Sequence, residues 1–169
     1  MAKMEFSGCT EIIEMLSKVG EKADKAASAA LYEGAKVTAD ALREAIEGLP
    51  TESFHPLPGA HNNGDTASPL RVLTPDDKAD LAASIGITKF EHSSDGVSTS
   101  ISIGEGYSRH PSKKYPRGIP LPLIARSIES GSSARSKKPF VRPTARKSEA
   151  PATAAMQAKL DEYVNNLTK

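Results

Sequence analysis

The sequence has no tryptophan, a single cysteine and few aromatic residues of any kind. Aromatic residues make up 5% of the 169 residues, and hydrophobic residues make up 38%. Because large aromatic side chains bury the most area per residue, we expect a lean core that leaves some apolar surface for neighbouring subunits to cover. The lone Cys9 excludes a disulfide within the chain, which is typical of proteins in a reducing compartment.

The chain also lacks the long apolar segments that membranes require. No apolar run approaches the roughly 18 residues needed to cross a bilayer, and the N-terminus has no hydrophobic signal region. We therefore expect synthesis in the cytoplasm and no contact with a membrane.

Motifs of catalysis and metal binding are missing as well. The sequence contains no Gly-x-Ser-x-Gly elbow, no phosphate-binding loop and no His-Glu-x-x-His pattern. Its four histidines do not pair at the spacing of metal ligands. Glu105 and Glu129 have no partner residues that would support acid–base chemistry. The sequence thus predicts neither an enzyme nor a cofactor or metal site.

Positive charge is concentrated in one part of the chain, although the formal net charge is only +1. Residues 108–149 hold 11 basic and 2 acidic residues, whereas residues 1–52 and 53–107 each have four more acidic than basic residues. Such a charge run is most often a solvated surface or a contact with an acidic neighbour, and less often a surface that faces DNA. Aromatic residues are not interleaved with the basic ones, so the pattern does not indicate base stacking.

A long amphipathic helix is predicted between Thr10 and Gly48. Apolar residues recur at steps of three and four from Ile12 to Ile46 and form one stripe, much of it alanine. Thr10 is suited to the N-cap, and Gly48 is suited to the stop. Gly20 is the point at which such a helix would bend or break.

A long loop or insertion is predicted for residues 51–75, where prolines, glycines and asparagines interrupt the periodic pattern. Apolar and polar residues then alternate in residues 81–87 and 97–103, which indicates two half-buried strands. The polar stretch at residues 91–96 predicts the turn of an antiparallel hairpin. We expect the long helix to cover one face of this hairpin.

The basic part of the chain is predicted to have mixed structure. Residues 108–120 form an irregular, basic loop, and residues 121–129 have the spacing of a short helix. Residues 137–143 are compatible with an extended segment or an edge strand, because prolines suit an edge better than a centre. A closing helix begins near Thr144 or at Pro151 and continues to residue 167.

These elements predict one α+β domain over residues 1–169. A long N-terminal helix would pack on a small antiparallel sheet, and a C-terminal helix would close the fold. The sequence has no internal repeat and no heptad run long enough for a coiled coil.

Three short segments carry a likeness to a known family. Residues 139–143 read Pro-Phe-Val-Arg-Pro, residues 128–131 combine an acidic residue with a glycine, and Leu81, Ser84 and Ile85 follow the spacing Leu-x-x-Ser-Ile. In this order the segments resemble those of the tail-component, or neck, proteins of siphophages, which are related to the minor tail protein Z of phage lambda. Two features depart from the family pattern: the insertion in residues 51–73, and the basic, proline-rich stretch in residues 109–120 that replaces a short approach to the acid–glycine patch.

This resemblance implies a structural protein of the virion. It would be a neck or tail-completion component that joins the tail to the head around the DNA channel. The resemblance also implies a homo-oligomeric ring of six or twelve copies in contact with other neck and tail proteins, with DNA in the channel as a further contact. Two alternatives stay open: a tail terminator that caps the tail tube, and a small nucleic-acid-binding module that uses residues 109–147.

Site residues are expected in the basic segment. Phe140 is expected to be buried, because a large apolar residue in a polar run usually marks burial, and Pro143 is expected to help anchor the segment. Four basic residues are predicted to make electrostatic contacts with a neighbouring subunit or with DNA: Arg135, Lys137, Lys138 and Arg142.

Overall fold

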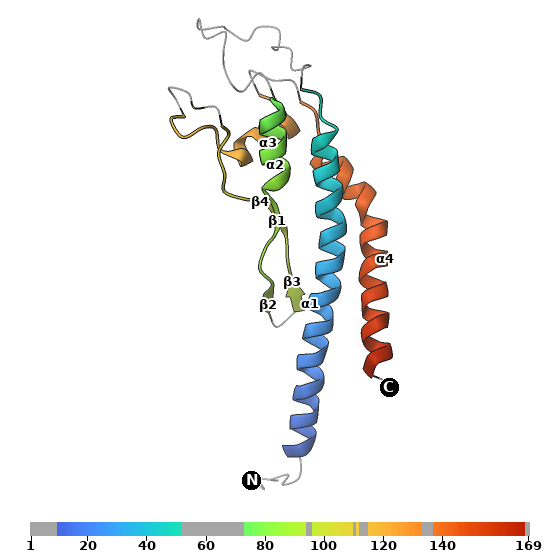
Figure 1. The fold of residues 1–169 in the computed structure, drawn as a ribbon. Coiled ribbons are helices and arrows are strands. Elements are labelled where there is room, and N and C mark those ends of the chain that lie inside the picture. Colours follow the sequence, from blue (N-terminus) through green and yellow to red (C-terminus); the bar gives the residue numbers. More distant parts are fainter. Residues whose placement is uncertain are drawn as a thin grey trace, which may run out of the picture.

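The fold is α+β, as the sequence predicts (Figure 1). In chain order the elements are α1 (Thr10–Glu47), α2 (Pro75–Ala83), β1 (Ile85–Ile87), β2 (Glu91–Ser93), β3 (Gly96–Ser98), β4 (Ile101–Ile103), α3 (Leu121–Ser130) and α4 (Val141–Leu167). The computed structural model describes residues 10–51, 73–93, 96–109, 111, 115–132 and 137–167.

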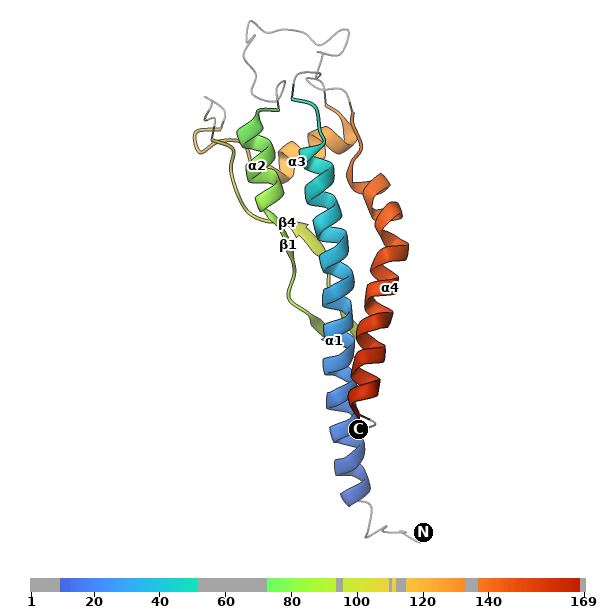
Figure 2. The same ribbon diagram turned by 45° about the vertical axis from the view of Figure 1, so that its right-hand side comes forward.

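The two long helices, α1 and α4, form the main axis of the molecule. They lie side by side and run in opposite directions, and α1 extends past the end of α4 (Figures 1 and 2). Small buried residues of α1 allow the close approach, and Gly34 lies directly against Met156 of α4. The helix continues through Gly20 without interruption, so the predicted break is wrong.

A narrow antiparallel ribbon packs against α1. The strand β1 pairs with β4, and β2 pairs with β3, which confirms the predicted hairpin. The register places Ile85 opposite Ile103 but Glu91 opposite Ser98. The segment between β1 and β2 therefore holds one residue more than the segment between β3 and β4. This offset is a β-bulge, and the hydroxyl of Thr88 bridges it by accepting from the Ser100 N–H at 2.9 Å.

Two boundaries in this region differ from the prediction. Residues 81–83 belong to α2 rather than to a strand, because α2 has a strong start upstream of them. The predicted turn is also shorter than residues 91–96, since Glu91–Ser93 forms β2. Pairing with β3 satisfies the backbone of these exposed polar residues, which their side chains alone do not reveal.

The helix α2 begins at the residue that was predicted to end the long loop. The N-cap is Thr74, whose side-chain oxygen accepts from the Asp77 N–H at 3.1 Å, while the Asp77 carboxylate accepts from the Thr74 N–H at 3.2 Å. This capping box, with Pro75 in the first turn, fixes the start of the helix. The rest of the predicted loop, residues 52–72, lies outside the described residues.

The side chain of Lys78 joins α2 to the end of α1. Its Nζ donates to the backbone carbonyl oxygens of Glu47 at 2.5 Å and Leu49 at 2.7 Å. These carbonyls are among those that a helix leaves without partners at its C-terminal end, where a positive charge is favourable. One lysine thus caps α1 and holds α2 beside it.

The segment before α4 was predicted to be an extended segment or an edge strand over residues 137–143. Residues 137–140 form no strand, and α4 begins at Val141, earlier than either predicted start. Pro143 fits the first turn, because the first residues of a helix need no N–H donor. Pro151 lies inside α4 rather than at its start, where it leaves the carbonyl of Lys147 without the usual helical donor.

The irregular stretch at residues 108–120 contains no helix or extended strand among its described residues, as predicted. Its two ends are nevertheless joined tightly. The N–H of Ser108 donates to the Ile119 carbonyl oxygen at 2.8 Å, and the Ile119 N–H donates to the Ser108 Oγ at 3.0 Å. Gly118 adopts φ +93°, and a Cβ at this position would overlap the Ser108 carbonyl oxygen.

One hydrophobic core joins the C-terminal half of α1 to α2, β1 and α3. The most deeply buried large side chains of the core are Ile46, Leu73, Leu81, Ile119 and Ile128.

Within the described part of the chain, no helix has the length and apolar character needed to span a membrane.

Candidate assembly surface

The carboxylate of Glu129, on α3, holds the beginning of α4. One carboxylate oxygen, Oε2, accepts from the N–H of Phe140 at 2.7 Å and of Val141 at 2.9 Å, and the other, Oε1, accepts from the Arg142 N–H at 3.3 Å. These N–H groups are ones that a helix leaves without partners at its N-terminus. An acidic side chain at this end also meets the positive pole of the helix dipole. The start of α4 is therefore fixed by a residue of α3.

The surroundings of Glu129 keep its carboxylate charged. The side chain is only 15% exposed, and this burial on its own would raise the pKa. The backbone N–H groups of Val141, Phe140 and Arg142 outweigh burial, with help from the Arg142 charge, and the pKa of Glu129 lies below its ordinary value. No acid–base partner for Glu129 is predicted from the sequence, and in the structure the residue positions the start of α4.

The described members of the predicted basic set differ in exposure. Lys137 is exposed, Lys138 is half-buried, and Arg142 is 85% exposed at the start of α4. The N–H of Lys138 donates to the Ile128 carbonyl oxygen at 2.7 Å, which ties this segment to α3. Arg135 lies outside the described residues.

Phe140 and Pro143 occupy different environments. Phe140 is 4% exposed and belongs to the main core, as expected from the sequence. Pro143 is exposed on the first turn of α4, so it shapes the helix start without entering the core. Burial of Phe140 and the cap from Glu129 therefore do the anchoring that was expected of the pair.

Beyond this start, α4 carries a basic face. The side chains of Arg142, Arg146 and Lys147 are all exposed, and the spacing of four residues places Arg142 and Arg146 on the same side. No acidic residue lies in the first turn of α4. Cations at a helix N-terminus oppose the dipole, so this arrangement costs stability and presents positive charge to the outside.

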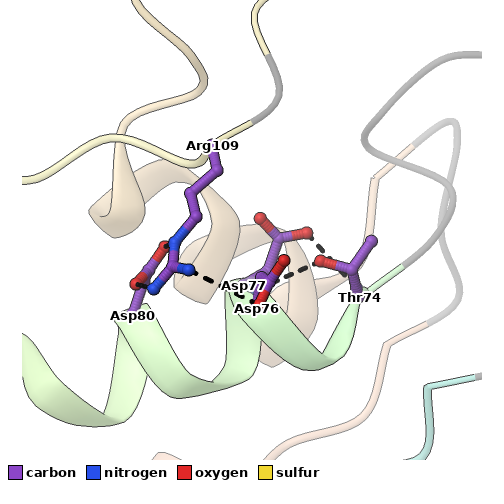
Figure 3. A network of polar contacts seen from close by, with 5 residues as sticks. All are labelled: Thr74, Asp76, Asp77, Asp80 and Arg109. Atoms are coloured by element: carbon purple, nitrogen blue, oxygen red, sulfur yellow. Dashed lines mark hydrogen bonds and ion pairs between the residues drawn. The ribbon is translucent and has the colours of Figure 1, made fainter.

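The positive charge of Arg109 is paired with carboxylates of α2 (Figure 3). Its Nε and Nη2 donate to the two carboxylate oxygens of Asp80 at 3.0 and 2.7 Å, and its Nη1 lies 3.6 Å from an oxygen of Asp76. The hydrogen bonds to Asp80, together with the charges of Asp80 and Asp76, raise the pKa of Arg109. This pairing attaches the start of the irregular stretch to α2.

Sequence reasoning missed the residues that organise these contacts. The partners of Arg109 are Asp76 and Asp80, one helical turn apart on α2, and their spacing is a signal only once residues 75–83 are read as a helix. The capping box at Thr74 was the local signal for that helix. No group of three or more histidine, cysteine, aspartate or glutamate residues that could hold a metal ion exists in the described ranges.

Comparison of the chain with protein-family models, with curated proteins and with solved structures gave no match.

Proposed function

We propose that this chain is a structural component of a tailed-phage virion, a neck or tail-completion protein that forms a ring where the tail joins the head. One observation carries the proposal. The two segments that most resemble the siphophage neck family, residues 128–131 and 139–143, touch each other through the Glu129 carboxylate and the backbone N–H groups at the start of α4. Two short likenesses that form one structural joint are stronger support than either alone.

The surface charges fit contacts between copies around a ring. Arg142, Arg146 and Lys147 are exposed on α4, and Glu44 and Glu47 are exposed near the end of α1. A head-to-tail contact between two copies would bring a basic face against an acidic one, and repetition of that contact closes a ring when the rotation permits. The basic side of such a ring would also tolerate DNA in its channel.

The deciding experiment is electron microscopy of a lysate from the phage that encodes this chain, with a stop codon early in the gene. The proposal expects filled heads beside separate or abnormal tails. Tails of uncontrolled length would favour a tail terminator. Normal, infectious, fully joined particles would exclude both structural functions.

A nucleic-acid-binding module is the second candidate, because Arg142, Arg146 and Lys147 lie at the positive end of the α4 dipole. Fluorescence anisotropy with a labelled DNA duplex tests it. A DNA-binding module would lose affinity steeply between about 50 and 200 mM salt, and the variant R142E/R146E would flatten that dependence. A ring component would show little binding as a free subunit and a native mass of six or twelve times 17.9 kDa.

A further inference from the structure

A groove runs along the edge of β4. Its volume is about 380 Å³, within the range of about 300–1,000 Å³ that is usual for binding pockets. Three consecutive residues of β4, Ile101, Ser102 and Ile103, line it. Because successive side chains of a strand point to opposite faces, a groove that touches all three residues lies along the edge of the strand rather than on one face.

The backbone of β4 is open on this edge. The Gly104 N–H donates to the Ser84 carbonyl oxygen at 2.7 Å, which makes these two a hydrogen-bonded pair of the ladder with β1. Hydrogen-bonded and non-hydrogen-bonded pairs alternate along an antiparallel ladder. The N–H and C=O groups of Ile101 and Ile103 therefore point away from β1, and no described residue is hydrogen-bonded to them.

The opposite edge of the ribbon is already covered. Arg43 of α1 donates from its Nη2 to the backbone carbonyl oxygen of Ile85 in β1 at 2.7 Å. The same alternation directs this carbonyl away from β4, so a side chain of α1 occupies the outer edge of β1. Among the described residues, the open edge is that of β4.

Much of the rest of the groove is apolar. Pro122 and Ala125 line it from α3, and three residues of the hydrophobic core, Leu42, Ile85 and Phe140, also line it. A strand edge on one side and a helix on the other form the usual setting in which an extended peptide adds to a sheet. The backbone groups of β4 would supply the hydrogen bonds, and the apolar surface would receive alternate side chains.

The charged residues that line the groove are Arg126, Arg142 and Glu129, so its net charge is positive. Arg126 on α3 is exposed and has no ion-pair partner in the described part of the chain, and Arg142 on α4 is 85% exposed. The nearest carboxylate, Glu129, lies 3.9 Å from the Arg142 Nε and already accepts three backbone hydrogen bonds. Two guanidinium groups are therefore available to carboxylates from outside the molecule.

We propose that the edge of β4 and this groove bind an extended, acidic peptide segment of another protein, which adds to β4 as a further strand. Apolar side chains of the segment enter the groove, and carboxylates on the alternate positions meet Arg126 and Arg142. This inference is independent of the proposed function, because it rests on the strand edge, the groove and its charge.

Nuclear magnetic resonance with the full chain tests the proposal. The probes are two blocked synthetic peptides of alternating sequence, Val-Glu-Val-Glu-Val and Val-Lys-Val-Lys-Val. We expect the acidic peptide to cause saturable shifts of the Ile101 and Ile103 amide signals and to slow their hydrogen exchange. The lysine peptide should cause neither. Absence of these shifts with the acidic peptide, or equal effects of the two peptides, would overturn the proposal.

Two charge reversals on exposed side chains refine the test. Arg126→Glu changes the rim of the groove and should weaken binding of the acidic peptide about tenfold, since attraction becomes repulsion. Arg117→Glu is the matched control, because Arg117 is exposed but does not line the groove. It should change the affinity less than twofold. An equal loss in both variants would show that net charge, rather than the groove, attracts the peptide.

Discussion

Replacing Glu129 with glutamine tests the joint between α3 and α4. The carboxylate accepts hydrogen bonds from three backbone N–H groups, those of Phe140, Val141 and Arg142, at 2.7, 2.9 and 3.3 Å. The variant keeps one acceptor oxygen of similar shape but loses the charge and the second oxygen. It therefore removes the electrostatic part of the cap with little change in packing.

The magnitude follows from the contacts. Hydrogen bonds to a charged group contribute about 1.5–3 kcal/mol, roughly twice a neutral bond, and loss of a helix cap costs about 0.5–2 kcal/mol. Because Glu129 is 15% exposed, water replaces little of what is lost. We expect Glu129→Gln to lower the free energy of unfolding by about 1–2 kcal/mol at pH 7. For a chain of this length the melting temperature should fall by roughly 2–8 °C.

The same variant should change the response to acid. The pKa of Glu129 in the folded chain lies below its ordinary value of 4.5. A lowered carboxylate pKa stabilises the fold in full above the unfolded-state pKa, and that stabilisation disappears as the pH falls through the folded-state pKa. The gap in stability between wild type and Glu129→Gln should thus be constant from pH 7 to about 5.5 and shrink below about 4.5.

Urea unfolding followed by circular dichroism measures both effects. Glu149→Gln is the matched control, because Glu149 is exposed on α4 and no backbone N–H binds its side chain among the described residues. This control should behave like the wild type at every pH. A Glu129→Gln variant as stable as the wild type at pH 7, or one whose deficit persists unchanged at pH 3, would contradict a stabilising, charged cap at Glu129.

Three further substitutions probe other joints of the fold by the same unfolding measurement. Gly118→Ala should cost about 2–4 kcal/mol, because φ is +93° and a Cβ would overlap the Ser108 carbonyl oxygen; a variant as stable as the wild type would contradict this geometry. Gly34→Ala should cost about 1–3 kcal/mol by overlap with Met156, and Met156→Ala should relieve part of that cost in the double variant. Simple additivity would show that the two helices do not meet there. Phe140→Ala should cost about 3–5 kcal/mol, and a loss below 1 kcal/mol would mean that Phe140 is not part of the core.

The elements that the sequence predicts well are those with a strong local pattern. The alanine stripe of α1, the alternation in residues 97–103 and the spacing of residues 121–129 each persist over several turns or strand residues. In residues 97–103, which span β3 and β4, the alternation matches burial as well. Val97 and Ile101 are half-buried there, while the serines between them are exposed. Periodicity is sufficient here because each element presents one face to the core.

The errors arise where a local signal competes with a misleading one. Thr74 and Pro75 mark the start of α2, but they follow a stretch rich in proline and glycine and were assigned to the loop. The alternation from Leu81 onward then continues from the helix into β1, so helix and strand share one apolar pattern. Pro143 was assigned to an extended segment or edge strand, although a proline is equally compatible with the first turn of a helix.

The joint at Glu129 has no local signal at all. Its carboxylate reaches N–H groups 11 to 13 residues later in the chain, across the segment before α4. The bulge between the two ladders is equally non-local, because it depends on how the strands pair rather than on either strand alone. The groove beside β4 combines residues of β1, β4 and three helices, so only the folded chain reveals it.

The pairing of α1 with α4 has a consequence for how the chain folds as it is made. The residues between Glu47 and Val141 must be synthesised before the partner of α1 begins to emerge, which takes on the order of ten seconds at about 5–20 residues per second. During that interval α1 presents its contact face to water. The residues of that face that lie beside α4 are small or medium-sized, namely Gly34, Val37, Ala41 and Ala45, rather than leucine or phenylalanine. A newly made helix of this kind offers little surface for aggregation while it waits.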